Sequence, residues 1–190
     1  MGDFAPFGSR PVWVGYAPSQ SGDSAGCVVP APPVVTGGKF RILERHQWKG
    51  MDFARQAESI PQLIEKYNAE YIDIDATVLG IGVFQLVRSF YPAARDIRHT
   101  PEMKTAMVLK AKNVIRRGCL EYDVSATDIT TSFMAIRKTM TSNWRSATYE
   151  ASHTEETSHA DVAWATMHAL LNEPLAASSG QVTSSIPEFN

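Results

Sequence analysis

The chain has 190 residues, of which 44% are apolar and 20% are charged, so it can form one domain with a substantial core. Its 18 Lys and Arg against 20 Asp and Glu give a net charge of −2, which excludes a generally basic nucleic-acid coat but permits a local basic face. The two cysteines are too few for a disulfide framework or a cysteine-based metal site. The N-terminal residues do not have the pattern of a secretory signal. The longest apolar stretch, Val28 to Val35, holds three prolines and cannot span a membrane. We expect a soluble protein of a reducing compartment.

Composition divides the chain into three parts. Residues 1–10 and 173–190 are rich in small residues, polar residues and prolines, which predicts a linker at the start and a flexible tail at the end. Hydrophobic periodicity is confined to residues 11–172, which we expect to form the domain.

The first element, PVWVGYA, is predicted to form a strand with Val12, Val14 and Tyr16 on one face and Trp13 and Gly15 on the other. Strands are predicted over 11–17, 24–30 and 39–48, and the last two are joined by a proline-rich connection that ends in Gly37-Gly38, a hairpin signal. These strands form an antiparallel meander, which we expect at one edge of a sheet.

Helical periodicity then takes over. A helix is expected over residues 52–67, with a kink or a split at Pro61, since proline inside a helix costs about 3 kcal/mol. A second helix starts at Thr100-Pro101, where threonine is the N-cap and proline takes the first helical position, and it ends at Gly118.

The capping-box spacing of Ser125 and Asp128 predicts a further helix, whose apolar stripe continues to Met140. The remaining predicted elements are strands over 70–75, 94–98 and 146–150 and helices over 79–90 and 158–171. Hairpins give antiparallel strand pairs and crossover helices give parallel ones. The order therefore predicts an α/β fold, a mixed sheet with helices on both faces.

Several familiar motifs are missing. Gly38-Lys39 follows one glycine too few for a phosphate-binding loop and lacks its Ser or Thr, so ATP hydrolysis by the usual route is not expected. The sequence has no nucleophile elbow and no cysteine-histidine cluster, and we expect no metal ligation by the scattered His153, His159 and His168. Carboxylates at strand ends and helix starts remain as candidates.

Asp75 ends the strand YIDID and precedes a glycine-containing loop, at the kind of sheet edge where ligands bind in open α/β folds. Asp73 shares its face of the strand. Either acid has a structural alternative, a hydrogen bond to the following turn. Asp161, in the segment SHAD, is either the acid of a capping box with Ser158 or a residue that faces the sheet and meets Asp75. Two such carboxylates would suit a divalent cation such as Mg²⁺.

Two further features are ambiguous in the same way. Asp23, in the turn SGD, is either an ordinary turn residue or a third acid of the site. The segment 101–117 is either a solvated helix face or a surface for a phosphate backbone. It carries one acid, Glu102, and the basic residues Lys104, Lys110, Lys112, Arg116 and Arg117.

Four long segments, in order along the chain, resemble one protein family. They are GYAPSQSGDSAGCVV, YIDIDATVLGIGVFQLV, MKTAMVLKAKNVIRRGCLEYD and EETSHADVAWATMHALLNEP. The chain resembles, over residues 11–172, the C-terminal nuclease domain of the large (ATPase) subunit of tailed-bacteriophage terminases, of the temperate myophage cohesive-end type. The resemblance implies a ribonuclease H-like fold and metal-dependent endonucleolytic cutting of concatemeric phage DNA, with Mg²⁺ or Mn²⁺ in a two-ion site.

The resemblance also implies roles for individual residues. Asp75 and Asp161 correspond to metal ligands and catalytic acids, and Asp23 to an auxiliary acid near the metals. The basic residues Lys104, Lys110, Lys112 and Arg116 are expected to lie along DNA. The family pattern has a further essential acid at the end of the first strand, in GYDPS, where this chain has Ala17.

Ala17 has three interpretations: an inactivating substitution, a decayed prophage copy, or a site in which Asp23 serves instead. The first two predict an impaired nuclease that still folds. The alternative function is a non-catalytic DNA-binding or docking module of the packaging motor, and a resolvase of the same fold is a weaker alternative.

The resemblance further implies double-stranded phage DNA, an N-terminal ATPase domain, the small terminase subunit and the portal as partners. It also implies a location in the cytoplasm of the bacterial host, with no membrane association.

Overall fold

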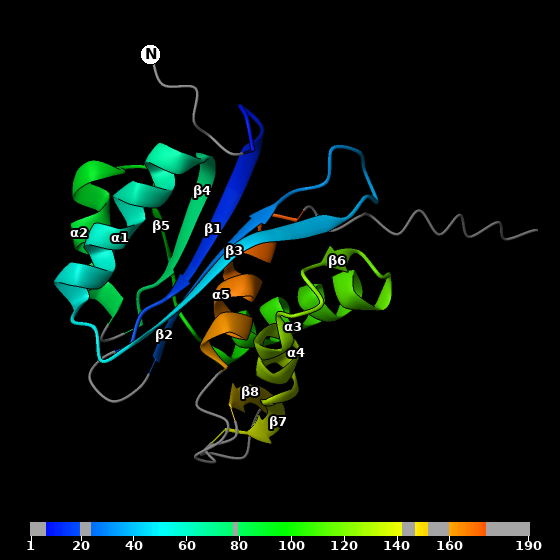
Figure 1. The fold of residues 1–190 in the computed structure, drawn as a ribbon. Coiled ribbons are helices and arrows are strands. Elements are labelled where there is room, and N and C mark those ends of the chain that lie inside the picture. The colour runs from blue at the N-terminus through cyan, green and yellow to red at the C-terminus, as the bar shows by residue number, and fades with distance from the viewer. Residues whose placement is uncertain (1–6, 20–23, 78–79, 142–146, 152–159, 174–190) are drawn as a thin grey trace, which may run out of the picture.

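The computed structural model describes residues 7–19, 24–77, 80–141, 147–151 and 160–173, which form strands and helices in mixed order (Figure 1). The strands are β1 (Pro11–Ala17), β2 (Ser24–Ala31), β3 (Phe40–Lys49), β4 (Asn68–Asp75), β5 (Arg95–Ile97), β6 (Leu120–Glu121), β7 (Ile136–Met140) and β8 (Ala147–Ala151). The helices are α1 (Phe53–Lys66), α2 (Gly80–Phe90), α3 (Pro101–Arg116), α4 (Thr127–Met134) and α5 (Asp161–Leu170). Within these ranges, no helix has both the length and the apolar character needed to cross a membrane.

Six strands form one mixed sheet in the order β5-β4-β1-β2-β3-β6. The strands β1, β2 and β3 pair antiparallel, whereas β4 lies parallel to β1, β5 parallel to β4, and β6 parallel to β3. The mixed sheet predicted from the sequence is therefore confirmed. The strands β4 and β5 extend the sheet beyond β1, whereas on the other side of the meander, within the described residues, β6 pairs with only Phe40 and Arg41 of β3, so most of β3 lies at an edge of the sheet. The strands β7 and β8 form a separate antiparallel pair.

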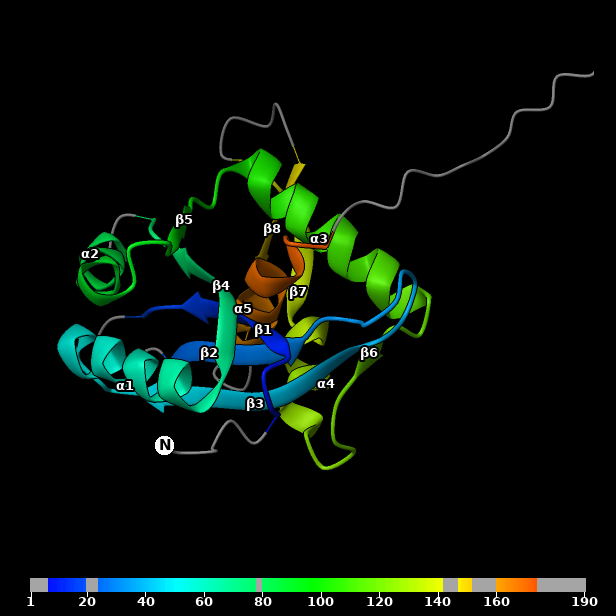
Figure 2. The same cartoon turned by 90° about the horizontal axis from the view of Figure 1, so that it is seen from above.

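Helices cover both faces of the sheet (Figure 2). On one face, α1 and α2 pack on side chains such as Val14 of β1 and Ile72 of β4. On the other face, α5 lies directly on β1 and β2, with α3 and α4 against it. Every residue of α5 from Val162 to Leu170 is buried, as expected for a helix enclosed by a sheet and two other helices.

Glycines in the two central strands allow α5 to lie this close. A Cβ atom on Gly15 of β1 would lie 1.8 Å from the carbonyl oxygen of Ala165, and one on Gly26 of β2 would lie 2.5 Å from the carbonyl carbon of Asp161. Neither neighbour is a flexible side chain, so any larger residue would push the helix away from the sheet. The two glycines thus determine how far the first and middle turns of α5 stand from the strands.

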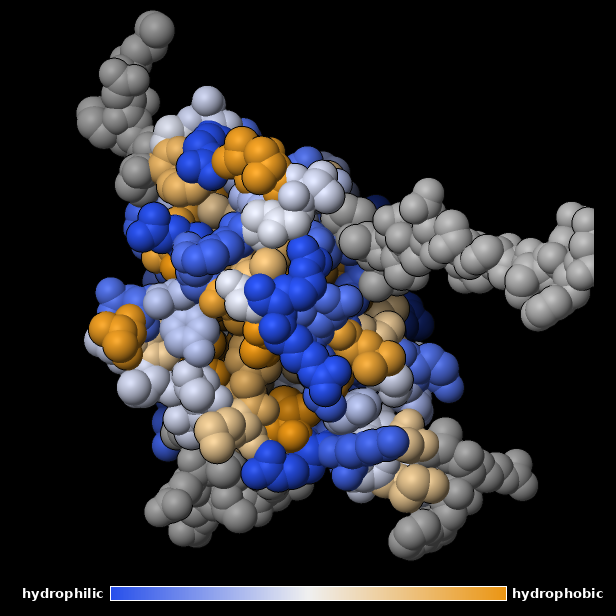
Figure 3. All heavy atoms as spheres, turned by 90° about the vertical axis from the view of Figure 1, so that its right-hand side faces the viewer, coloured by the Kyte–Doolittle hydropathy of each residue, from blue (hydrophilic) through white to orange (hydrophobic). Residues whose placement is uncertain are grey.

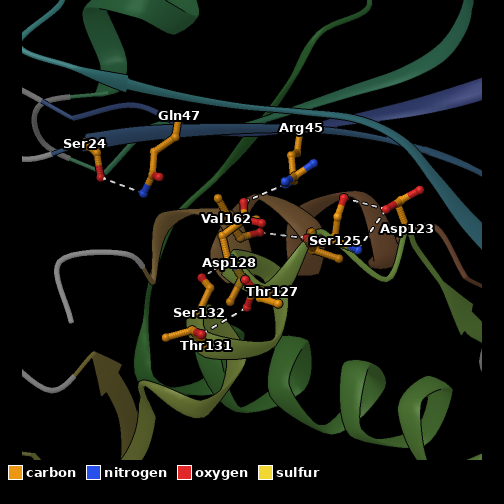
Figure 4. Close-up of polar contacts among 12 residues, drawn as sticks. Ser24, Arg45, Gln47, Asp123, Ser125, Thr127, Asp128, Thr131, Ser132 and Val162 are labelled. Atoms are coloured by element: carbon orange, nitrogen blue, oxygen red, sulfur yellow. Dashed lines mark hydrogen bonds and ion pairs between the residues drawn. The ribbon is translucent and has the colours of Figure 1, made fainter. Parts of the chain in front are cut away.

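Polar contacts from α4 hold the first turn of α5 in place (Figure 4). Ser132 Oγ accepts a hydrogen bond from the backbone N–H of Ala163 at 2.7 Å, which satisfies one of the donors that a helix start leaves unpaired. One turn earlier on α4, Asp128 accepts a hydrogen bond from Arg45 Nε of β3 at 2.6 Å. The helix α4 therefore links β3 to the start of α5.

Several local predictions are confirmed. Thr100 is the N-cap of α3 and its hydroxyl accepts from the N–H of Met103, while Gly118 has the positive φ of a residue that ends a helix. Gly37 also has a positive φ, at the hairpin between β2 and β3. Pro61 does not split α1, which is assigned as one helix from Phe53 to Lys66.

The helix predicted to continue to Met140 is wrong in its second half. The helix α4 ends at Met134, and residues 136–140 form β7, which pairs with β8 through partners such as Lys138 and Tyr149. The predicted capping box is also wrong, since the Ser125 hydroxyl donates to Asp123 and α4 begins without a side-chain cap. The other predicted cap, Ser158, lies outside the described residues.

Replacement of Gly15 by alanine is expected to destabilise the fold by about 3 kcal/mol, because the added methyl group meets the backbone of α5. Urea denaturation followed by circular dichroism measures the change. Gly82→Ala is the matched control: nothing lies within 4 Å of the place that a methyl group on Gly82 would take, so alanine should stabilise α2 by about 0.5–1 kcal/mol. Equal midpoints for the two variants would contradict the close contact described.

Candidate functional site

The carboxyl ends of β1 and β4 and the start of β2 meet at one edge of the sheet, on the face covered by α5. The parallel register pairs Tyr16 with Ile74, so the next residues, Ala17 and Asp75, follow side by side. Ala17 pairs with Gly26 across the antiparallel register, and Gly26 is the residue on which the backbone of Asp161 rests. The fold thus brings the ends of three segments, far apart in the sequence, to one edge.

Asp75 uses its two carboxylate oxygens differently. Oδ1 accepts a hydrogen bond from the backbone N–H of Thr77 at 2.8 Å, which is the structural alternative expected for a turn aspartate. Oδ2 lies 3.4 Å from Nδ1 of His99, which belongs to the segment between β5 and α3. The side chain is 18% exposed, so this carboxylate is accessible from solvent. The turn contact fixes Asp75 and leaves its second oxygen directed at His99.

Asp73 lies on the same face as Asp75 but is fully buried. Arg95 donates to both of its oxygens, at 2.7 and 2.9 Å, and Asn172 donates to Oδ2 at 2.5 Å. Burial raises the pKa of Asp73, and the hydrogen bonds from Arg95 and Asn172 oppose that rise. Asp73 therefore joins β4 and β5 in a partly buried ion pair and, through Asn172, contacts the segment that follows α5.

Asp161 is the first residue of α5 and is half-buried. Its Oδ2 accepts a hydrogen bond from Ser24 Oγ of β2 at 2.7 Å. Ser24 Oγ in turn accepts from Gln47 Nε2 of β3 at 3.2 Å (Figure 4). The Asp161 side chain therefore lies against β2 of the sheet, whereas its expected meeting with Asp75 stays a prediction. Asp23, the third acid, lies outside the described residues, although Ser24 follows it directly.

Two imidazoles lie behind Asp75. The Nε2 atoms of His99 and His168 are 2.7 Å apart, and Nδ1 of His168 lies 3.1 Å from the backbone carbonyl oxygen of Tyr16. Burial lowers the pKa of His168 well below its usual value. Burial also lowers the pKa of His99, with the Asp75 charge acting in the opposite direction. Both rings are therefore held toward their neutral forms.

Sequence reasoning did not find this pair of histidines. His99 and His168 are 69 positions apart, and neither belongs to a recognisable spacing motif. A histidine just before the N-cap of a helix, as His99 is, gives no local signal of its partner. Among the residues described, no three His, Cys, Asp or Glu side chains converge closely enough to be assigned as a metal site.

The basic residues predicted to bind DNA lie along α3, and three of them contact other elements. Lys110 Nζ donates to the carbonyl oxygens of Leu171 and Glu173, at 2.5 and 2.7 Å, and so caps the end of α5. Lys104 lies over the ring of Trp164 and Lys112 over that of Tyr149, with the ammonium nitrogens 5.8 and 5.3 Å from the ring centroids.

A groove of about 840 Å³ runs along α3. It is lined by Ala106, Leu109, Lys110, Lys112, Asn113, Arg116 and Arg117. No acid contributes to this lining, so the groove carries positive charge. Figure 3 views the side of the molecule that lies on the right in Figure 1, where hydrophilic side chains predominate and hydrophobic ones are scattered among them.

The donor atoms at this edge suit a divalent cation. Carboxylate oxygens are the ligands that Mg²⁺ and Mn²⁺ take, and the partly exposed Asp75 has one oxygen without a backbone hydrogen bond. Asp161 adds a second carboxylate on the same face of the sheet. The arrangement is chemically suited to metal-assisted hydrolysis, in which carboxylates hold ions that activate water.

Comparison with known proteins places these features in a family. A family model described as the terminase RNaseH-like domain matches residues 14–173. The chain is 83% identical over 185 residues to the terminase ATPase subunit of Escherichia phage P2, covering 97% of this chain and 31% of that protein. It is 44% identical over 172 residues to the probable terminase ATPase subunit of Haemophilus phage HP1 (strain HP1c1), covering 90% of this chain and 28% of that one. The chain thus spans about a third of the length of these relatives.

Solved structures share the fold at low sequence identity. The large terminase nuclease from thermophilic phage G20c with bound magnesium has a TM-score of 0.72 and 14% identity, covering 90% of this chain and 84% of that one. The large terminase nuclease domain from bacteriophage SPP1 with bound Mn has a TM-score of 0.61 and 10% identity, covering 87% and 88%. The ribonuclease H-like fold expected from the sequence is confirmed. The chain belongs to the family of terminase RNaseH-like domains.

Proposed function

We propose that this chain is the nuclease domain of a phage terminase large subunit, an endodeoxyribonuclease that cuts concatemeric DNA during genome packaging. The observation that carries the proposal is the meeting of Ala17, Asp75 and the start of α5 at one edge of the sheet. The proposal is supported by Asp75 and Asp161, two carboxylates at this edge that match acids implied by the family resemblance. Nuclease domains of the same fold bind magnesium or Mn, which supports a divalent cation here as well.

Asp75 and Asp161 are the proposed ligands of Mg²⁺ or Mn²⁺, with Asp23 as an auxiliary acid. Bound divalent cations would activate a water molecule and stabilise the leaving oxygen of the phosphodiester. The protein's part is orientation: Thr77 holds one oxygen of Asp75, and Ser24 holds one oxygen of Asp161.

The expected partners follow from the same proposal. Double-stranded phage DNA is the substrate, and the ATPase domain belongs to the same subunit, as the longer relatives suggest. The small terminase subunit and the portal complete the packaging assembly, which acts in the cytoplasm of the bacterial host.

Ala17 supports a second candidate, a non-catalytic DNA-binding or docking module. An alanine side chain provides no ligand at the end of β1, where the family pattern has an acid, and so would weaken two-ion hydrolysis while leaving the fold intact. The two candidates differ in metal binding. A nuclease domain needs Asp75 and Asp161 to bind a cation, whereas a docking module does not need to bind one.

Mn²⁺ is expected to raise the melting temperature of the protein, because a ligand that binds only the folded state stabilises it by about 2.7 kcal/mol at 100 times its Kd. Differential scanning calorimetry over a range of Mn²⁺ concentrations measures the shift. The Asp75→Asn variant should lose most of it. A melting temperature that does not respond to Mn²⁺ would favour the docking module.

Ala17→Asp is expected to cut supercoiled plasmid in Mn²⁺ on the order of 100-fold faster than the chain as given, which corresponds to about 2.7 kcal/mol in the transition state. Gel analysis of nicked and linear products gives the rates. Ala17→Asn is the matched control, since it has nearly the same shape without the charge and should gain little.

The double variant Ala17→Asp/Asp75→Asn should be inactive. If the chain as given already cuts as fast as Ala17→Asp, another acid serves in place of Ala17. If Ala17→Asp fails to cut although it folds and binds Mn²⁺, the nuclease proposal for this domain is wrong.

The basic face of α3 is proposed to lie along the DNA backbone. The double variant Lys104→Glu/Lys112→Glu should weaken DNA binding and reduce the slope of log affinity against log salt by about 2, because each phosphate contact contributes about 1. Fluorescence anisotropy at several salt concentrations measures both.

Lys49→Glu/Arg55→Glu is the control with the same change in net charge. It reverses two exposed cations on β3 and α1, on the other side of the molecule from α3, and should leave the slope almost unchanged. Equal effects of the two double variants would mean that α3 is not a specific DNA surface.

A further inference from the structure

A buried chain of polar atoms leads from the backbone of β1 to Asp75. It runs from the Tyr16 carbonyl oxygen to His168, from His168 to His99, and from His99 to the carboxylate of Asp75. His168 is fully buried and the His99 side chain is 12% exposed. Buried polar groups are costly unless their hydrogen bonds are satisfied, so the positions of the protons along this chain are constrained.

The backbone carbonyl determines the tautomer of both rings. The oxygen of Tyr16 can only accept, so the hydrogen of a neutral His168 lies on Nδ1 and its Nε2 carries a lone pair. His99 must then donate from Nε2 across the 2.7 Å contact. A neutral His99 therefore has its own lone pair on Nδ1, the atom that faces Asp75.

This lone pair lies beside a carboxylate oxygen that also has lone pairs. Nδ1 of His99 and Oδ2 of Asp75 are 3.4 Å apart, which is longer than an ordinary hydrogen bond between nitrogen and oxygen. Two facing acceptors repel unless a proton or a cation lies between them. Two donors at this separation can share one metal ion, since zinc-like ions bind imidazole nitrogen and carboxylate oxygen at ~2.0–2.2 Å.

The surroundings of both donors match those of metal ligands. A histidine that binds a metal almost always donates its other ring N–H to a protein acceptor, as His99 does to His168. Thr77 ties the two donors together: its N–H donates to Oδ1 of Asp75, and its hydroxyl accepts from the backbone N–H of His99 at 2.9 Å. The ring of His99 also packs against Trp164, with centroids 5.0 Å apart. The pair is thus held rigidly before any ion arrives.

We propose that Nδ1 of His99 is a metal ligand alongside Asp75, so that the site includes a nitrogen donor in addition to its carboxylates. The proposal rests on the proposed function in taking Asp75 as a metal ligand. An imidazole favours Co²⁺ and Zn²⁺ over Mg²⁺, which prefers oxygen ligands. The metal preference of this site is therefore set in part by the segment between β5 and α3.

The test compares metal affinities of tag-free protein for Co²⁺ and Mg²⁺, by isothermal titration and by the visible absorption of bound Co²⁺. In His99→Asn the side-chain amide lies near the position of Nδ1 and can still hydrogen-bond Asp75, but it is a poor ligand for Co²⁺. We expect a 10- to 100-fold loss of Co²⁺ affinity with a changed absorption spectrum, and only a few-fold change for Mg²⁺. His46→Gln on β3, a histidine paired with Glu44, is the control and should change neither.

Asp75→Asn separates this proposal from the proposed function. If Asp75→Asn abolishes Co²⁺ binding while His99→Asn leaves the affinity and the spectrum unchanged, His99 is not a ligand and the carboxylate site stands. If Asp75→Asn has no effect either, the metal assignment of the proposed function fails as well.

A measurement on the unsubstituted protein avoids any dependence on the folding of a variant. Proton–nitrogen correlation spectra of the histidine rings, recorded during a Zn²⁺ titration, should show Nδ1 of His99 changing its shift while Nε2 stays protonated. An unchanged Nδ1 signal at saturating Zn²⁺ would overturn the proposal.

Discussion

The contact between α5 and the central strands is the constraint on which the site depends. At Gly15 and Gly26 the helix backbone lies where any side chain would collide with it, so this close packing of α5 on the sheet requires glycine at both positions. This contact determines the position of Asp161 at the start of the helix and of His168 further along it. Packed interiors of this kind transmit small changes in volume directly to the groups they support. The positions of the candidate site residues on α5 thus depend on glycine at positions 15 and 26.

Burial distinguishes the two aspartates of β4. Asp73 is enclosed and pairs with Arg95 and Asn172, a combination that holds three segments together and leaves no oxygen for a ligand. Asp75 stands two residues further along, at the edge, and has only one oxygen in a backbone contact. A buried charge must be paired to be tolerated, whereas a partly exposed one can stay charged for another partner. The same residue type on the same strand face therefore has two different roles.

Local pattern accounts for most of the fold. Short apolar runs bounded by turn signals predicted β1, β2, β3 and β4 to within two residues at either end. The error at β7 has a physical cause: Ile136 and Met140 continue the helical spacing of Ile129 and Phe133, but their segment is claimed by pairing with β8. The pairing of β7 with β8 is a tertiary contact, which the spacing of apolar residues within one segment cannot predict. The two-residue β6 is too short to produce any pattern.

The candidate site could be predicted only where it coincides with strand ends and helix starts. Asp75 and Asp161 were proposed in this way, because β4 ends and α5 begins at this edge of the sheet. The tautomer chain through His99 and His168 could not be found, since it depends on a backbone carbonyl of β1 and on packing between distant segments. Pro61 was expected to disrupt α1, yet the helix stays whole because Ala57, Ile60 and Leu63 pack its buried face against the core.

The short pairing between β3 and β6 affects how readily this domain could associate with other chains through its sheet edge. Among the described residues, β6 pairs only with Phe40 and Arg41, although β3 continues to Lys49. A long strand with an open edge is a template for pairing with strands of other chains. Here charged side chains along β3, together with the Arg45–Asp128 link to α4, oppose such pairing. In the described part of the chain, most of β3 has no neighbouring strand on its outer side. Charged side chains and the contact with α4, and not a further strand, therefore protect this edge against pairing with another chain.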